Sequence, residues 1–189
     1  MTRQIRVLAI NGSLRKQSFN GLALREAIAL APPGMDIDVY GGLGEIPPFN
    51  QDHADAGLAP VTALKHAIRK ADAILLCTPE YNHSIPGVLK NALDWASFPA
   101  STDNALAGKP VAILGASQSP IGTARAQEQL RQVLAFVDMQ VVNKPEVLIG
   151  LAGTRFDGGG RLVDEVALRL IAQLLANLKT LADKQVHAA

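Results

Sequence analysis

Three short, unbroken apolar runs constrain the fold of this 189-residue chain more than any other feature. They cover residues 7–10, 73–77 and 111–114, and each is followed at once by small or polar residues. A strand with one face in water would alternate apolar and polar side chains, and these runs do not alternate. They are therefore typical of parallel strands that are covered on both faces.

Longer amphipathic segments lie between and after these runs. Apolar residues recur at helical spacing in five of them, over residues 24–31, 61–71, 88–96, 130–137 and 166–178. Weaker strand patterns occur over residues 37–40, and over one or both of 139–142 and 147–149. Strands that alternate with helices indicate βαβ units and a parallel sheet. We expect one flavodoxin-like α/β domain over residues 1–189, a three-layer, doubly wound, five-stranded parallel sheet in the order 2-1-3-4-5.

Composition argues against several classes of function. The net charge is +1, from 18 basic and 17 acidic residues with no basic run, which disfavours a nucleic-acid partner. The single cysteine, Cys77, excludes an intrachain disulfide and a cysteine-based zinc site, and its place in a predicted strand indicates a buried side chain. No apolar run approaches the roughly 20 residues that span a membrane, and no signal peptide is evident. We expect a cytoplasmic protein with no membrane partner.

The chemistry should lie in the loops that follow the three strong strands, because ligands of open α/β sheets bind beyond the carboxyl ends of the strands. The first loop, residues 11–20, offers a tight turn, two hydroxyls, two cations and an amide, from Gly12, Ser13, Arg15, Lys16, Ser18 and Asn20. Amides at a helix start and an arginine fork both favour an anion such as phosphate. The alternative is a capped helix, with Ser18 or Asn20 as the N-cap and the cations in solvent.

The second loop, residues 78–87, is stiffened by Pro79 and Pro86. Tyr81 is placed to form one wall of a ring site, and Asn82 to hydrogen-bond a ring edge. The alternative is a surface turn in which Ser84 caps the next helix. We expect His83 to be a solvated loop residue.

Two further expectations concern residues that follow the second loop. The only tryptophan, Trp95, is expected in the core or in a subunit contact. The third loop, residues 115–125, is rich in small residues, and Ser117 is placed to donate to the far edge of the same ring. The alternative for this loop is an ordinary turn with Thr123 as a helix cap.

Other nucleotide-binding and hydrolytic motifs are absent from the sequence. It contains no Gly-x-x-x-x-Gly-Lys-Ser/Thr, no Gly-x-Gly-x-x-Gly and no Gly-x-Ser-x-Gly. A phospho-receiver domain would carry acidic residues at the strand ends, where this chain has Asn11 and Thr78.

Two motifs in order resemble those of the NADPH-dependent FMN reductase family, and among its members the bacterial quinone- and chromate-reducing flavoenzymes. The first is Gly12-Ser13-Leu14-Arg15-x-x-Ser18-x-Asn20, and the second runs from Pro79-Glu80-Tyr81-Asn82-x-Ser84 to Lys90-Asn91-Ala92-x-Asp94-Trp95. The resemblance implies that Ser13, Arg15, Ser18 and Asn20 bind the FMN phosphate. It also implies that the second loop wraps the flavin ring, with Pro79, Glu80, Tyr81, Asn82 and Ser84, joined by Ser117 from the third loop. The chain departs from the family at Ser119-Pro120, where a glycine pair is usual.

The resemblance implies an enzyme that passes a hydride from NADPH, or NADH, through bound FMN to quinones, flavins or adventitious acceptors such as chromate and azo compounds. No catalytic side chain and no metal are expected, because the flavin N5 does the chemistry. A homodimer or homotetramer is expected, in which Arg125 pairs across the subunit interface. The alternatives are a flavodoxin-type electron carrier, which the net charge of +1 disfavours, and an FMN-binding sensor without turnover.

Overall fold

A parallel sheet forms the centre of the molecule, and its strand order is the one expected. The computed structural model describes residues 3–54 and 56–188. The sheet has the order β2-β1-β3-β4-β5, with β6 also paired to β4, and every strand pair is parallel. The strands are β1 Ile5–Asn11, β2 Met35–Val39, β3 Ala73–Cys77, β4 Pro110–Ala116, β5 Gln140–Val141 and β6 Val147–Ile149.

The fifth position of the sheet is filled by two short strands. β5 pairs with the start of β4, where Pro110 lies opposite Gln140, and β6 pairs with its end, where Leu114 lies opposite Val147. The two weak patterns at residues 139–142 and 147–149 therefore both contain a strand. Between them lies Pro145, which has no N–H to donate to a neighbouring strand.

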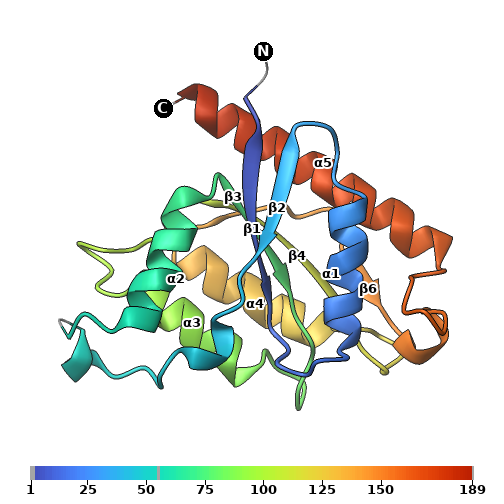
Figure 1. Ribbon diagram of the computed structural model, residues 1–189, viewed down its shortest axis with the longest axis horizontal. Helices are drawn as coiled ribbons and strands as arrows, with labels where there is room; N and C mark the ends of the chain where they lie inside the picture. The colour runs from blue at the N-terminus through green and yellow to red at the C-terminus, as the bar shows by residue number, and fades with distance from the viewer. Residues whose placement is uncertain (1–2, 55, 189) are drawn as a thin grey trace.

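Five helices cover the two faces of the sheet, at all five positions where the apolar spacing predicts them. They are α1 Phe19–Ala29, α2 Ala59–Lys70, α3 Gly87–Ser97, α4 Ala124–Phe136 and α5 Glu165–Ala188. Figure 1 shows α2 and α3 to the left of the sheet and α1 to its right. Short 3₁₀ turns lie at Leu43–Glu45, Gln51–His53 and Ala152–Thr154. None of the helices in residues 3–54 and 56–188 is long and apolar enough to cross a membrane.

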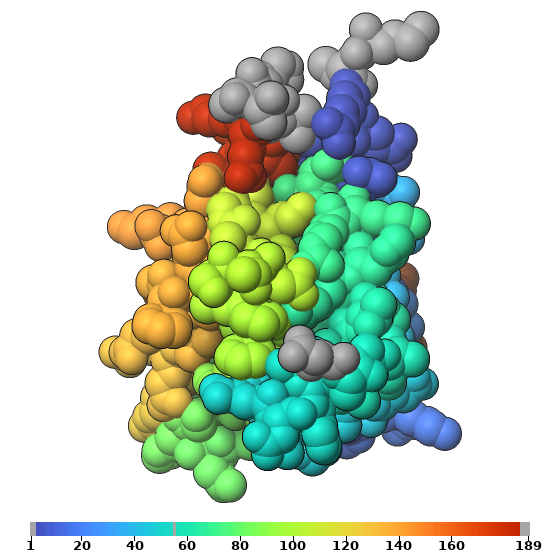
Figure 2. Space-filling model, turned by 90° about the vertical axis from the view of Figure 1, so that its left-hand side faces the viewer, coloured from blue at the N-terminus to red at the C-terminus, as the bar shows by residue number. Residues whose placement is uncertain are grey.

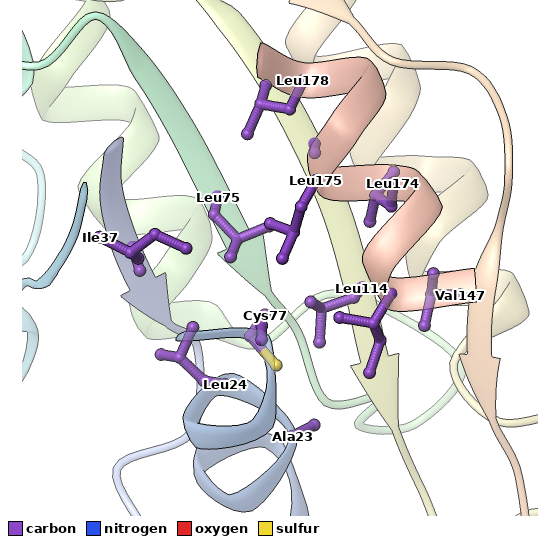
Figure 3. Close-up of a cluster of buried hydrophobic side chains, with 14 of the residues drawn as sticks. Ala23, Leu24, Ile37, Leu75, Cys77, Leu114, Val147, Leu174, Leu175 and Leu178 are labelled. Carbon is purple, nitrogen blue, oxygen red and sulfur yellow. The ribbon is translucent and has the colours of Figure 1, made fainter. Parts of the chain in front are cut away.

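Each face of the sheet has its own apolar core. Leu24 of α1 and Leu174 and Leu178 of α5 pack on one face, together with Leu75 and Leu114 of the central strands (Figure 3). Leu64, Leu89 and Leu130, from α2, α3 and α4, pack on the other face. The central strands β3 and β4 are buried along their whole length, as their unbroken apolar runs indicate.

Residues 46–49, in the segment between β2 and α2, are held against α3 by Asn91 and Trp95 of the second motif. Trp95 is buried, and its indole Nε1 donates to the carbonyl of Pro47 at 2.8 Å. The amide of Asn91 accepts from the backbone N–H of Phe49 at 2.7 Å, and the Phe49 ring contacts Trp95 edge-on. Trp95 therefore lies in the core, where the sequence expectation left the core and a subunit contact open. Figure 2 shows this side of the molecule, with the segment around Phe49 in cyan.

Candidate functional site

The loops that follow β1, β3 and β4 meet at one end of the sheet and enclose a hollow of about 210 Å³. Its lining brings together most of the predicted site residues: Ser13, Arg15, Ser18, Phe19, Asn20, Pro79, Glu80, Tyr81, Ala116, Ser117 and Gln118. Gly12 lies where the first loop crosses the second. A Cβ there would come within 3.2 Å of Pro79 and 3.3 Å of Pro86, so a residue without a side chain lets the two loops pack together.

The first loop presents donors at the start of α1. Ser18 is the N-cap of this helix, and its Oγ accepts from the N–H of Gly21 at 2.9 Å. The hydroxyl proton of Ser18 is left to donate elsewhere. Ser13 is buried and its Oγ lies 3.3 Å from the hydroxyl of Tyr81. The guanidinium of Arg15 is exposed and lies 5.7 Å from the centroid of the Phe19 ring. Two hydroxyls and a cation therefore lie beside a positive helix end.

Asn20 is 3% exposed, and both polar ends of its side-chain amide bind the backbone of one residue. Its Nδ2 donates to the carbonyl of Ala116 at 2.9 Å, and its Oδ1 accepts from the N–H of Ala116 at 2.9 Å. The amide therefore fixes the first turn of α1 beside the end of β4. Asn20 is not the N-cap of α1, and its direct contact with a phosphate stays a prediction.

The second loop contains a two-residue turn. Tyr81 and Ser84 exchange two backbone hydrogen bonds, of 3.0 and 2.9 Å, around Asn82 and His83. Both of these residues have positive φ, 51° and 63°, as a type I′ turn requires. Figure 1 shows the green segment after β3 projecting from the end of the sheet. Tyr81, Asn82 and His83 are exposed there, as expected for His83, while the contact of Asn82 with a ring edge stays a prediction.

The turn is attached to α4 through Gln129. The hydroxyl of Ser84 donates to Oε1 of Gln129 at 2.6 Å, and Nε2 of Gln129 donates to the carbonyl of His83 at 2.8 Å. The alternative that Ser84 caps the next helix is wrong, because α3 begins at Gly87 after Pro86 and has no side-chain cap.

Glu80 turns its carboxylate to the start of α4. Oε2 accepts from the backbone N–H groups of Arg125 and Ala126 at 3.0 and 3.1 Å, and Oε1 lies 3.6 Å from Nη1 of Arg125. Thr123 is the N-cap residue of α4, as the alternative for this loop expects, but its side chain makes no capping bond, because its Oγ1 accepts from Nε2 of Gln127 instead. Arg125, expected at a subunit interface, has its ion pair with Glu80 of its own chain. Sequence reasoning missed this link, since nothing in the spacing of residues 80 and 125 indicates it.

The third loop packs on the residues that follow β6. The N–H of Ser117 donates to the carbonyl of Ile149 at 2.9 Å, and the Oγ of Ser117 accepts from the N–H of Ser119 at 3.1 Å. Gly122 has a φ of 63°, and a Cβ on it would lie 2.9 Å from the backbone of Leu148. The hydroxyl proton of Ser117 remains to donate toward the hollow that it lines.

No protein nucleophile or metal cluster accompanies these loops in the described part of the chain. Cys77 is fully buried at the end of β3, and its Sγ donates to the carbonyl of Asn20. Burial raises the pKa of the Cys77 thiol well above its usual value, so the reactive thiolate does not form near neutral pH. Residues 3–54 and 56–188 hold no group of three metal-ligating side chains.

A larger hollow of about 790 Å³ lies elsewhere, between α2 and the strands β1 and β2. Its lining mixes alanines of α2 with charges of both signs, including Asp38 and Lys70, and contains no residue of the three loops. The smaller hollow therefore fits the motif chemistry better, despite its size.

Comparison with known proteins points to one family. A sequence profile of the NADPH-dependent FMN reductase family matches residues 5–154. An NAD(P)H-dependent FMN reductase of Pseudomonas aeruginosa is 51% identical over 180 residues, which cover 95% of this chain and 96% of that protein. A quinone reductase of Escherichia coli is 42% identical over 180 residues, covering 93% and 95%. The structure of the flavoenzyme NAD(P)H:(acceptor) oxidoreductase FerB of Paracoccus denitrificans superposes with a TM-score of 0.86 at 32% identity, covering 95% and 98%.

Proposed function

Since the chain belongs to the NADPH-dependent FMN reductase family, we propose that it is a flavoenzyme that oxidises NAD(P)H and reduces quinones. The reaction would transfer a hydride and take up a proton, so that NAD(P)H and a quinone yield NAD(P)⁺ and a hydroquinone. Free flavins, chromate and azo compounds are further acceptors in this proposal. The observation that carries it is the hollow at the strand ends, because residues of both motifs line it together.

The first loop fits the phosphate of FMN. A phosphate needs charge-assisted and hydroxyl donors, and Ser13, Arg15 and Ser18 supply them beside the start of α1. Ser18 is held in place by its bond to Gly21, so its proton is directed away from the helix. Asn20 supports the same turn from behind through Ala116.

The second and third loops fit a flat ring. Pro79 and Tyr81 contribute a proline ring and an aromatic ring to the lining of the hollow, while Ala116 and Ser117 are small and leave room for a ligand. When bound, FMN supplies the redox chemistry, accepting a hydride from the nicotinamide at its N5 and delivering electrons to the acceptor. The side chains named here bind and orient the reactants and exclude water, and none of them is required as a nucleophile.

An enzyme is better supported than the two alternatives. Relatives that match nearly the whole chain are named as reductases, whereas a flavodoxin-type carrier or a sensor without turnover finds no counterpart among them. The net charge of +1 also differs from the acidic surface expected of a flavodoxin.

Two assays on the purified protein test the proposed function. Cofactor released by heat should elute as FMN on a chromatography column, and FAD as the main species would contradict the phosphate site. NADPH oxidation, followed by the loss of its absorbance, should be slow alone and strongly stimulated by added benzoquinone. Bound FMN without any stimulated oxidation would favour the carrier or the sensor.

We also propose a homodimer or homotetramer that works in the cytoplasm. The support is the hollow itself, since a ring placed on the loops of one small chain keeps an edge open that a neighbouring subunit can cover. Light scattering at micromolar concentration should give a mass of two or four chains of 20.0 kDa each. A mass equal to one chain would contradict the assembly but leave the cofactor site unaffected.

A further inference from the structure

We propose that Glu80 is a positioning residue that sets the spacing between the second and third loops, and so determines which quinones the site admits. The inference rests on the proposed function, because it concerns the acceptors of that reaction. It assigns the Glu80 carboxylate a role that it exerts through the backbone of α4.

The carboxylate of Glu80 accepts the hydrogen bonds that an N-cap side chain would accept, because the side chain of the N-cap residue of α4 makes no capping bond. The first amides of a helix have no partner within it, and an N-cap side chain usually accepts from the second or third of them. In α4 the second and third amides belong to Arg125 and Ala126, and both N–H groups donate to Oε2 of Glu80. The Glu80 side chain is only 6% exposed, and a carboxylate at this end of a helix also interacts favourably with the helix dipole.

Glu80 thereby binds the second loop to the first turn of α4, while the bonds of Gln129 to His83 and Ser84 attach the same loop farther along this helix. The third loop is attached to the end of β6, through Ser117 on Ile149 and Leu151 on Ser119. It leads directly into α4, whose first turn is bound to Glu80 of the second loop. Because residues of both loops line the hollow, loss of the Glu80 link should change the spacing between them.

The phosphate end of the site has no direct bond to the Glu80 carboxylate, although Ser13 lies 3.3 Å from the hydroxyl of the neighbouring Tyr81. Ser13, Arg15 and Ser18 belong to the first loop, and neither oxygen of the Glu80 carboxylate binds them. Losing the Glu80 link should therefore alter the choice among acceptors much more than the affinity for FMN.

The variants Glu80→Ala, Glu80→Gln and Glu128→Gln separate these effects in the FMN-loaded enzyme. Glutamine keeps an oxygen that can accept from α4, whereas alanine removes it. Glu128→Gln is the matched control, since it neutralises an exposed carboxylate on the same helix. kcat and KM are measured with a benzoquinone and with a bulkier naphthoquinone, and the Kd for FMN is measured by fluorescence.

In Glu80→Ala, the ratio of kcat/KM for the two quinones should change about tenfold, the effect of losing one charge-assisted hydrogen bond. The change should come mainly from KM, and the Kd for FMN should stay within about threefold of wild type, less than 1 kcal/mol. Glu80→Gln should recover most of the wild-type ratio, and Glu128→Gln should retain it. An unchanged ratio in Glu80→Ala, or an equal loss in FMN affinity, would overturn the inference.

Amide hydrogen exchange of the flavin-free protein gives a readout that does not depend on turnover. The amides of Arg125 and Ala126 should exchange faster in Glu80→Ala and nearly as in wild type in Glu80→Gln. Unaltered exchange in Glu80→Ala would show that the carboxylate does not hold α4. Wild-type protein that oxidises no NAD(P)H would instead refute the proposed function, while active wild type with an unaltered quinone ratio in Glu80→Ala would refute the Glu80 inference alone.

Discussion

Arg15 and Asn20, both placed at the phosphate end of the proposed site, have very different surroundings. Arg15 is exposed, with its guanidinium against the Phe19 ring, and is free to turn toward a phosphate. Asn20 is buried and both polar ends of its amide bind Ala116. The first residue provides charge, and the second keeps the turn that presents the other donors in place.

Replacing Arg15 by alanine should weaken FMN binding. Losing a charge-assisted hydrogen bond costs about 1.5–3 kcal/mol, which raises the Kd roughly 10- to 150-fold. Fluorescence titration of the apoprotein measures it. Lys16→Ala is the control and should change the Kd by less than about threefold, because Lys16 does not line the hollow. An Arg15→Ala protein with wild-type affinity would show that the guanidinium is merely solvated.

Replacing Asn20 by alanine should destabilise the protein with or without flavin. It leaves the N–H and the carbonyl of Ala116 without their partner in a buried place, which should lower the free energy of unfolding by about 2–4 kcal/mol. Urea denaturation of the apoprotein measures this change. Gln17→Ala, at an exposed position of the same loop, should stay within about 0.5 kcal/mol. Equal stabilities of the two variants would contradict the role given to Asn20.

At the scale of elements, strands and helices follow from local patterns, but their attachments do not. The unbroken runs locate β1, β3 and β4 because burial on both faces leaves a direct mark on the sequence. The five helices follow likewise from apolar spacing. The cap of α4 could not be found this way, because its acceptor, Glu80, lies 45 positions earlier in the chain. The same limit applies to the bonds of Asn20 to Ala116, which lies 96 positions later in the chain.

Gly115 shows how tightly β4 and α4 pack behind the site. A Cβ on this residue would lie 2.1 Å from Oγ1 of Thr123 and 2.4 Å from the carbonyl oxygen of Thr78. Gly115→Ala should therefore lower the free energy of unfolding by about 3 kcal/mol or more, as severe overpacking does. Gly158→Ala, where a Cβ would meet nothing within 4 Å, is the control and should be near neutral. Denaturation curves of both variants make the comparison, and a fully stable Gly115→Ala protein would contradict this packing.

At the scale of the whole molecule, one end of one sheet has to serve two substrates. The three loops meet in a single hollow, so the nicotinamide and the quinone are expected to use the same face of the flavin in turn. The donor must then leave before the acceptor enters.

This arrangement predicts ping-pong kinetics. Initial rates at varied NADPH and varied quinone should give parallel lines in double-reciprocal plots. Product inhibition supplies the control, because NADP⁺ and the quinone should compete for the reduced form of the enzyme. Intersecting lines would show that both substrates bind together, and a second place for the acceptor would then have to exist.

The central claim, that the first loop binds the phosphate of FMN, is tested most directly by comparing FMN with riboflavin. The two ligands share the ring and the ribityl chain and differ in the phosphate alone. Titration of the apoprotein should show FMN binding at least about 100-fold more tightly, the equivalent of one or two charge-assisted hydrogen bonds. Equal affinities for FMN and riboflavin would contradict the account, because the donors at Ser13, Arg15 and Ser18 would then not be holding a phosphate.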